Sequence, residues 1–313
     1  MPQAVLLGDP ACFEIRSGAN PHTRDRWGRR KKVDPALANS QWLYFKSVLE
    51  SFGIRIYVVP PVKGLPGLVF PANAGFRFEQ RFFLSNLHSG RAGEKEHYRA
   101  ILERIFPSVE EFPAPLRFEG EADFFPVGDP SGDPRKAVHL FTSGRLEKRR
   151  WIFRFGFPPY RRVYGFRSDR AALPALQEIV GKREIIPLEL VDEAHYHGDT
   201  VLCPFGPREE FLLAYLEALS PDSQVILRRR FGDRLVPLSR EDGSAFAANS
   251  FQVETSYYGR EEKLLLMPDG LTTAVYEEVR SRGVIPYPVD LSEFLRKGGG
   301  ALKCMLLNLG EIF

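Results

Sequence analysis

The residue with the clearest chemical potential is a cysteine near the end of the chain, Cys304, which follows three glycines, Gly298 to Gly300. Glycine has no Cβ, so the backbone there can adopt a positive φ and lets another group approach closely. A thiol beside such a turn could attack a small ligand. The same residues could equally form a flexible turn and a C-terminal strand that buries an inert cysteine, because free cysteine is often a core residue.

A second candidate lies in the segment 191–206, where His197 stands two residues before Asp199. In an extended segment both side chains would face the same side, since the side-chain period of a strand is two. A histidine beside a carboxylate can act as a general acid or base near neutral pH. The alternative is that His195 and His197 are ordinary polar residues of a loop.

Three carboxylates alternate along one strand-like run, at Glu119, Glu121 and Asp123. They could line one face of that run, although crowded like charges cost free energy unless the face is wet or holds a cation. The alternative is an exposed edge strand whose acids prevent aggregation.

Two more polar residues could point into a pocket. Asn73 ends the apolar run 64–72 and is followed by Ala74 and Gly75, a pattern that also suits a simple turn. Arg167 stands just before Asp169, where a helix is expected to begin. Its guanidinium suits bidentate capture of a carboxylate, and a surface arginine is the default alternative.

A repeated unit must position these residues. Five times, a helical or turn segment precedes a short apolar strand, and the clearest case is 34–60, where Asp34 and Pro35 start a helix and Gly53 ends it. The units span 34–60, 94–118, 169–190, 221–238 and 271–289. A doubly wound sheet would produce part of this pattern, but the repetition favours five ββαβ modules in one closed α/β domain covering 1–313.

The segment from about 126 to 165 interrupts this repetition and is rich in Gly, Pro, Arg and Phe. We expect a long hairpin or a surface loop there. It could serve as a lid, or it could be a plain insertion.

The composition limits the class of protein. The chain has 313 residues, of which 43% are hydrophobic and 27% charged, with a formal net charge of +3, values typical of a soluble globular protein. Short basic clusters are interspersed with acids and indicate solvated faces rather than a nucleic-acid site. No apolar run reaches the roughly 18 residues that span a bilayer, and the N-terminus lacks a signal-peptide pattern. We therefore expect a cytoplasmic protein that binds neither nucleic acid nor membrane.

The three cysteines, Cys12, Cys203 and Cys304, are scattered along the chain. The sequence contains neither a Cys-x-x-Cys motif nor a histidine-rich ligand spacing, which are the usual signs of a zinc site, so no metal is expected. In a reducing compartment at least one thiol could stay free.

Six short motifs occur in a fixed order along most of the chain: Leu-Pro-x-Leu-Val-Phe-x-Ala-Asn-Ala-Gly, Arg-Ala-Gly-Glu, Phe-Glu-Gly-Glu-Ala-Asp, Phe-Arg-Ser, His-Gly-Asp-Thr and Gly-Gly-Gly-x-x-x-Cys. From about Asn20 onward, the chain resembles the amidinotransferase and dimethylarginine dimethylaminohydrolase branch of the guanidino-group-modifying superfamily. That resemblance implies a five-bladed pseudo-symmetric α/β propeller, the pentein fold, in agreement with the five modules.

The resemblance also implies roles for the reactive residues. Cys304 would attack the guanidinium carbon and form a covalent amidino-cysteine, which divides one hard displacement into two easier ones. His197 would protonate the departing amine and then activate water or an acceptor amine. A carboxylate would orient His197, and because the motif is displaced by one residue from that of related deiminases, both Glu119 and Glu121 are candidates.

The remaining site residues implied by the resemblance would bind the substrate. Asp199 would hold the guanidinium nitrogens and Arg167 the α-carboxylate, with further contacts from Asn73, Asp123 and Phe70. This chemistry requires no metal and no organic cofactor. Two departures from the family pattern count against arginine itself: Asn73 stands where relatives often carry Asp, and Gly67 where an acid is common.

The sequence therefore predicts a hydrolase of arginine-type guanidines, similar to dimethylarginine dimethylaminohydrolase, that acts on a small-molecule substrate and could be a homodimer. An amidinotransferase shares the same covalent intermediate and is the first alternative. A binding protein without chemistry on the same fold is the second, although it would be expected to lack the cysteine or the histidine.

Overall fold

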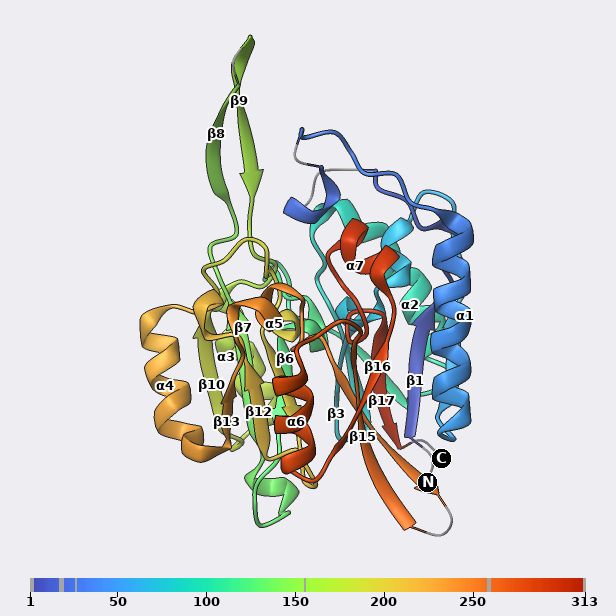
Figure 1. The fold of residues 1–313 in the computed structure, drawn as a ribbon, viewed down its shortest axis with the longest axis vertical. Coiled ribbons are helices and arrows are strands. Elements are labelled where there is room, and N and C mark those ends of the chain that lie inside the picture. Colours follow the sequence, from blue (N-terminus) through green and yellow to red (C-terminus); the bar gives the residue numbers. More distant parts are fainter. Residues whose placement is uncertain (1–2, 17–19, 26, 155, 258–259, 312–313) are drawn as a thin grey trace.

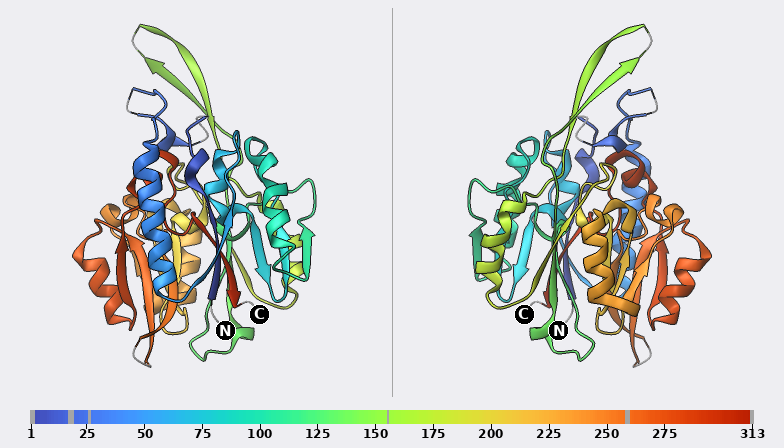
Figure 2. Two further views of the ribbon diagram at one scale, coloured as in Figure 1. Left: turned by 90° about the vertical axis from the view of Figure 1, so that its right-hand side faces the viewer. Right: turned by 90° about the vertical axis from the view of Figure 1, so that its left-hand side faces the viewer.

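The computed structural model of the chain describes residues 3–16, 20–25, 27–154, 156–257 and 260–311. Five small sheets of three strands each lie around the middle of the molecule, and the longer helices lie on their outer side (Figures 1 and 2). The five-bladed α/β propeller that the resemblance implies, and with which the five sequence modules agree, is confirmed. Within the described residues, no helix combines the length and the apolar character needed to cross a membrane.

Each sheet, or blade, repeats one pattern. Its first and second strands are antiparallel, and its third strand runs parallel to the second. In this order the blades are β17 (Leu306–Glu311), β1 (Gln3–Gly8) and β2 (Arg55–Val59); β3 (Gly75–Phe78), β4 (Arg81–Leu84) and β5 (Ser108–Glu111); β6 (Phe124–Val127), β7 (Val138–Ser143) and β10 (Ile185–Glu189); β11 (Leu202–Phe205), β12 (Phe211–Ala214) and β13 (Leu235–Pro237); β14 (Phe251–Tyr257), β15 (Arg260–Pro268) and β16 (Ile285–Val289). Because β17 pairs with β1, segments from the two ends of the chain share one blade and close the ring.

A helix connects the second strand of each blade to the third, as a parallel crossover requires. These helices are α1 (Pro35–Ser51), α2 (Lys95–Leu102), α3 (Leu173–Val180), α4 (Pro221–Phe231) and α6 (Thr273–Ser281). The predicted boundaries of α1 follow from its caps: the Asp34 side chain accepts from the backbone N–H groups of Ala36 and Leu37, and Gly53 just beyond the helix has a φ of +76°. Two shorter helices, α5 (Arg240–Ser244) and α7 (Ser292–Gly298), lie outside the repeat.

One hydrophobic cluster links α1 to the turn that precedes β17. Phe45 of α1 and Phe294 of α7 are fully buried in it, together with Leu302 and Met305. Truncating a buried phenylalanine to alanine typically costs about 3–5 kcal/mol. Because Leu302 and Met305 flank Cys304, this core also fixes the backbone that carries the cysteine.

Three predicted elements are wrong in detail. The third strand of the second blade is β5 and not Leu116–Phe118, since Val109 of β5 packs against a buried cluster that includes Leu84 of β4. The acidic run does not form a strand around its three carboxylates, because it folds into a 3-10 turn at Gly120–Ala122 before β6 begins. The C-terminal strand, one of the two interpretations of the segment around Cys304, begins only at Leu306, so Cys304 lies in the turn before it.

A two-stranded hairpin, β8 (Lys148–Arg154) and β9 (Phe157–Tyr164), falls inside the segment 126–165 and projects from the body of the molecule (Figures 1 and 2). The side chains of Trp151 and Phe153 on it are exposed. Its use as a lid, and the assignment of 1–313 to one domain, stay predictions.

Candidate active site

The turns that precede the first strands of the five blades supply the polar residues of one site. Each inner strand, β3, β6, β11, β14 and β17, follows a tight turn. In chain order, these turns or the residues that flank them carry Asn73, Asp123, Asp199, Asn249 and Cys304, all buried. The five positions recur at nearly constant spacing, and the one longer interval, from 123 to 199, contains the β8–β9 hairpin.

A cavity of about 270 Å³ lies beside these turns. Its lining includes Cys304, His197 and Glu119, and also Arg167 and Phe70. Asp199 does not line this cavity, but it contacts the cysteine from below. The sequence-predicted residues are thus brought together with one exception, Glu121.

Cys304 lies where its neighbours leave room for the thiol. A Cβ on Gly300 would stand 2.9 Å from the cysteine Sγ, so this glycine is required by a close approach. The Cys304 Sγ donates to Asp199 Oδ2 at 3.3 Å and accepts from Asn249 Nδ2 at 3.1 Å. Burial and the adjacent Asp199 carboxylate raise the pKa of the Cys304 thiol well above its usual value. The resting thiol is therefore protonated, and a bound cation would favour the thiolate.

His197 is held between carboxylates. Its Nδ1 lies 3.1 Å from Asp123 Oδ2, and its Nε2 lies 3.4 Å from Glu119 Oε2 and 3.2 Å from Asn73 Nδ2. Burial alone would lower the pKa of His197, but Asp123 and the other nearby carboxylates outweigh burial and raise it. The same partners would favour an imidazolium in the resting site.

Asp123 is fixed by four donors. Its Oδ1 accepts from the backbone N–H of Gly198 at 2.9 Å and from Thr142 Oγ1 at 2.8 Å, and its Oδ2 accepts from Ser168 Oγ at 2.6 Å and faces His197. These hydrogen bonds hold the Asp123 carboxylate, and with it its partner His197, in one orientation. Gly198 is required here, since a Cβ on it would stand 2.2 Å from the Thr142 hydroxyl.

Glu119 is also buried and charged. Burial would raise the pKa of Glu119, yet His197, Arg167 and Arg91 together lower it. Its Oε1 accepts from the backbone N–H of His88 at 2.9 Å. Glu119 and Asp123 therefore both contact the His197 ring, Glu119 at Nε2 and Asp123 at Nδ1.

The orientation of the Asn73 amide is set by Arg91. Arg91 Nη1 donates to Asn73 Oδ1 at 2.6 Å and Arg91 Nη2 donates to the backbone oxygen of Gly67 at 2.7 Å, while Glu94 pairs with the guanidinium at 2.7 Å. The Asn73 NH2 group must then face His197, whose Nε2 can accept from it only when the imidazole is neutral. The two departures from the family pattern, Asn73 and Gly67, are thus bound by the same arginine.

Asp199 separates the thiol from a smaller cavity beneath it. Burial raises the pKa of Asp199 to about 6. Its Oδ1 is buried and has no hydrogen-bond partner within the described part of the chain. Glu121, by contrast, lies away from His197: its Oε1 is 2.8 Å from Lys303 Nζ.

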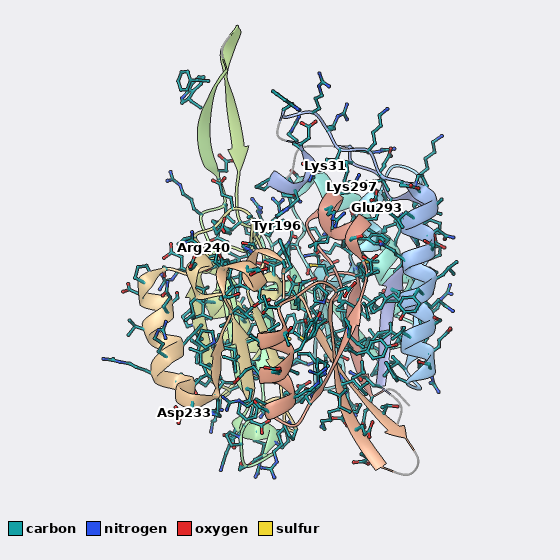
Figure 3. The ribbon with its side chains drawn as sticks, viewed as in Figure 1. Lys31, Tyr196, Asp233, Arg240, Glu293 and Lys297 are labelled. Atoms are coloured by element: carbon teal, nitrogen blue, oxygen red, sulfur yellow. The ribbon has the colours of Figure 1, made fainter. Side chains whose placement is uncertain are left out.

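Arg167 and Phe70 stand at the wall of the 270 Å³ cavity. The Arg167 guanidinium lies over the ring of Tyr196, 5.0 Å from its centroid. Figure 3 shows Tyr196 just below the base of the projecting hairpin. This position suits a cation that receives the far end of a small ligand.

Sequence reasoning missed Asn249, Arg91 and Ser168 as site residues. Asn249 is fully buried, and besides the cysteine contact it donates to the backbone oxygen of Asp199 and accepts from the N–H of Ala301. The recurring spacing of the turns could have found it. Among the described residues, no group of His, Cys, Asp and Glu is arranged to hold a metal ion.

Residues 160–311 match the family model of N,N-dimethylarginine dimethylhydrolase, eukaryotic. The chain is 29% identical over 308 residues to the bifunctional arginine dihydrolase/ornithine cyclodeaminase AgrE of Nostoc sp., a match that covers 98% of this chain and 38% of AgrE. The chain thus spans about two fifths of that relative. It is also 27% identical over 311 residues to the N(G),N(G)-dimethylarginine dimethylaminohydrolase of Mycobacterium tuberculosis, covering 96% of this chain and 83% of that enzyme.

A solved structure extends the similarity to three dimensions. The N-terminal domain of a variant of ArgZ, covalently bound to a reaction intermediate, superposes with a TM-score of 0.80 and 25% identity over 99% of this chain and 98% of that one. The similarity covers the whole propeller together with the segments that carry the site.

Proposed function

Because the chain belongs to the amidinotransferase and dimethylarginine dimethylaminohydrolase branch of the guanidino-group-modifying superfamily, we propose that it hydrolyses a C–N bond of an arginine-type guanidino substrate. The observation that carries the proposal is the arrangement at the cavity floor. The Cys304 thiol contacts Asp199 at 3.3 Å, and His197 lines the same cavity with Asp123 behind it.

The first half of the reaction uses the charge of the substrate. A guanidinium cation beside Asp199 offsets the carboxylate that otherwise keeps the thiol protonated, so Cys304 loses its proton to solvent on binding. The thiolate then attacks the guanidinium carbon, and the electron pair of one C=N bond moves onto nitrogen. His197, as the imidazolium, donates its proton to the departing nitrogen, and the C–N bond breaks.

The second half returns the enzyme to its starting state. Neutral His197 takes a proton from water, the hydroxide adds to the carbon held on sulfur, and collapse expels the Cys304 thiolate. Asp123 keeps the imidazole in one orientation throughout, since three other donors fix its own carboxylate. The product is a ureido compound when one nitrogen leaves.

The substrate class follows from the wall of the cavity. A volume of about 270 Å³ suits a single amino acid. Asp199 would bind the guanidinium, and Arg167 would bind the α-carboxylate at the other end. Arginine and methylated arginine both fit this description.

A second hydrolysis of the same carbon is a further candidate. The relatives AgrE and ArgZ are named arginine dihydrolases, and here a neutral amide, Asn73, contacts His197 Nε2 at 3.2 Å. A ureido group is uncharged, so a site with one carboxylate fewer would retain it more readily for a second attack. Arginine and two waters would then give ornithine, carbon dioxide and two ammonia molecules.

Quenched-flow mass spectrometry tests the proposal. The protein is mixed with L-arginine or dimethylarginine, and the Cys304 peptide is weighed while citrulline, ornithine, ammonia and dimethylamine are quantified. Hydrolysis at a terminal nitrogen predicts an adduct that retains the amino-acid part of the substrate. A small amidino adduct together with a need for an acceptor amine would instead indicate a transferase.

Matched cysteine variants control the experiment. Cys304→Ala should abolish both adduct and turnover. Cys203→Ala should retain them, because Cys203 is buried in another cluster and burial raises its pKa to about 12. Turnover that survives Cys304→Ala would refute the proposal.

A further inference from the structure

A buried ion pair lies directly behind the nucleophile. Lys303 precedes Cys304 in the chain, yet its side chain points away from the 270 Å³ cavity and lines a separate cavity of about 70 Å³. Only 9% of Lys303 is exposed. Its Nζ lies 2.8 Å from Glu121 Oε1 and 5.5 Å from the centroid of the Phe251 ring.

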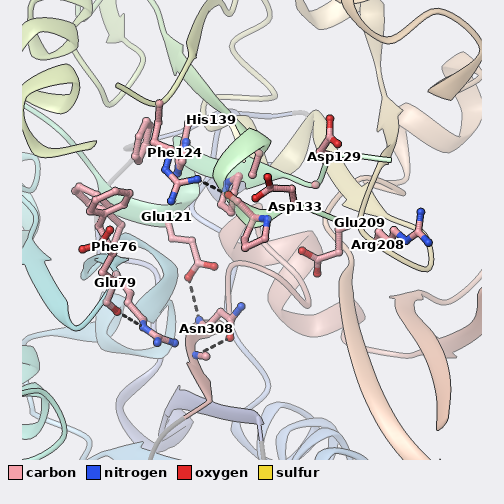
Figure 4. A pocket seen from close by; sticks show the side chains of 18 of the residues that line it. Phe76, Glu79, Glu121, Phe124, Asp129, Asp133, His139, Arg208, Glu209 and Asn308 are labelled. Atoms are coloured by element: carbon pink, nitrogen blue, oxygen red, sulfur yellow. Dashed lines mark hydrogen bonds between the residues drawn. The ribbon is translucent and has the colours of Figure 1, made fainter. Parts of the chain in front are cut away.

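Glu121 is held for this contact by the backbone. Its Oε2 accepts from the N–H of Asn308 in β17 at 2.9 Å, a contact drawn as a dashed line in Figure 4. Glu121 belongs to the Gly120–Ala122 turn, whose flanking residues Glu119 and Asp123 serve His197 on the other side. One short turn therefore places Glu119 and Asp123 beside His197 and Glu121 beside Lys303.

Asp199 connects the Cys304 thiol to the small cavity. Its Oδ2 contacts the Cys304 thiol, while its side chain lines the 70 Å³ cavity together with Lys303 and Glu121. The charged groups that face Asp199 are His197 and Lys303, which favour its ionised form, and Asp123, which opposes it. Glu209 lines the small cavity as well.

We propose that Lys303 and Glu121 are positioning residues. Through Asp199, their charges set the protonation of the Cys304 thiol from the side away from the 270 Å³ cavity. The positive charge of Lys303 favours the ionised form of Asp199, and the negative charge of Glu121 offsets part of that effect. This assignment of Cys304 and Asp199 as the reacting pair rests on the proposed function.

The pair makes a signed prediction. In Lys303→Met, an unpaired Glu121 makes the surroundings of Asp199 and Cys304 more negative, so both groups become harder to ionise. In Glu121→Gln, an uncompensated lysine makes ionisation easier. Each variant should shift the pH midpoint of Cys304 ionisation by roughly 0.5–1 unit, in opposite directions, and Lys303→Met/Glu121→Gln should fall between them.

The pH dependence of alkylation measures this without any substrate. Iodoacetamide is added over a range of pH, and carboxamidomethylation of the Cys304 peptide is followed by mass spectrometry. Lys263→Met is the control, because Lys263 pairs with Glu254 on the β14–β15 hairpin, outside the 70 Å³ cavity. A merely structural pair would lower the melting temperature of both variants without moving the midpoints in opposite directions.

Two arms separate this inference from the proposed function. The same variants are assayed for kcat/KM against pH with L-arginine. Opposite alkylation shifts without any hydrolysis would support the electrostatic role and refute the function. Hydrolysis with midpoints that do not move, or that move in the same direction, would refute the inference alone.

Discussion

The two ends of the inner strands carry similar numbers of charged side chains but use them differently. Strands β3, β6 and β17 begin at the turns of the proposed catalytic cavity, the one of about 270 Å³, and end at a cavity of about 550 Å³, shown in Figure 4. At that far end the arginines bind backbone: Arg77 donates to the oxygen of Leu309 at 3.0 Å, and Arg183 donates to that of Pro134. The far cavity is twice as large, yet its cations mainly hold loops in place.

At the catalytic end, polar side chains bind one another and leave atoms available. The Asp199 Oδ1 and Glu119 Oε2 atoms are buried without a hydrogen-bond partner among the described residues. Leaving such atoms unpaired costs free energy, about 1–3 kcal/mol each. Unsatisfied carboxylates around a thiol and a histidine thus distinguish a reactive site better than cavity size does.

The largest effect should come from matched carboxylates at the two ends. Asp123→Asn removes the acceptor for His197 and disturbs the three other donors, so kcat/KM should fall by roughly 10²–10⁴. Asp133→Asn, at the rim of the far cavity and paired with Arg135, should change kcat/KM by less than about twofold. The assay is arginine turnover at pH 7 on variants whose melting temperatures have been compared. Equal losses for both variants would remove the functional contrast between the two ends.

The pH profile should sharpen the same contrast. Asp199 must be ionised to bind a guanidinium, and burial raises its pKa to about 6. As the pH falls through 6, the carboxylate gains a proton, and kcat/KM should fall about tenfold per unit below that value. Asp199→Asn should be nearly inactive at all pH values and lack this limb. A limb near pH 4 in the wild type would contradict the role of Asp199.

The sequence predicted the architecture better than the details of the site. Helix α1 was located from Asp34, Pro35 and Gly53, because caps are local signals. The motif around His197 and Asp199 and the glycines before Cys304 are also local. These features depend on a few neighbouring residues, so one sequence suffices to find them.

The site features that the sequence did not predict depend on contacts between distant segments. A strand through the acidic run would have put Glu121 on the same face as Glu119 and Asp123. The 3-10 turn directs the Glu121 side chain toward Lys303 instead. Asn249 gave no motif, since its three partners come from other turns. Only the nearly constant spacing of the inner strands encodes it.

The smallest effect should appear at the far end, where a histidine is buried away from the 270 Å³ cavity. His139 stacks on Phe124 with ring centroids 5.1 Å apart and an interplanar angle of 17°. Its Nδ1 has no hydrogen-bond partner in the described part of the chain, and burial, with the charge of Arg183, lowers its pKa to about 4. The unfolded chain binds this proton near pH 6.5. The folded protein therefore loses stability as the pH falls from about 7 toward 4.

His139→Phe keeps the aromatic stack and removes the titration. At pH 7 the free energy of unfolding should rise slightly, because a desolvated ring nitrogen is lost. At pH 5 the advantage over the wild type should grow to about 1–2 kcal/mol, since only the wild type's unfolded state gains a proton there. Urea unfolding at both pH values measures the difference, and arginine turnover at pH 7 should stay within about twofold. A stability difference that is the same at pH 7 and pH 5 would mean that His139 titrates normally in the fold. An altered turnover would mean that the far cavity is coupled to the catalytic one, and the two ends would then have to be treated as a single site.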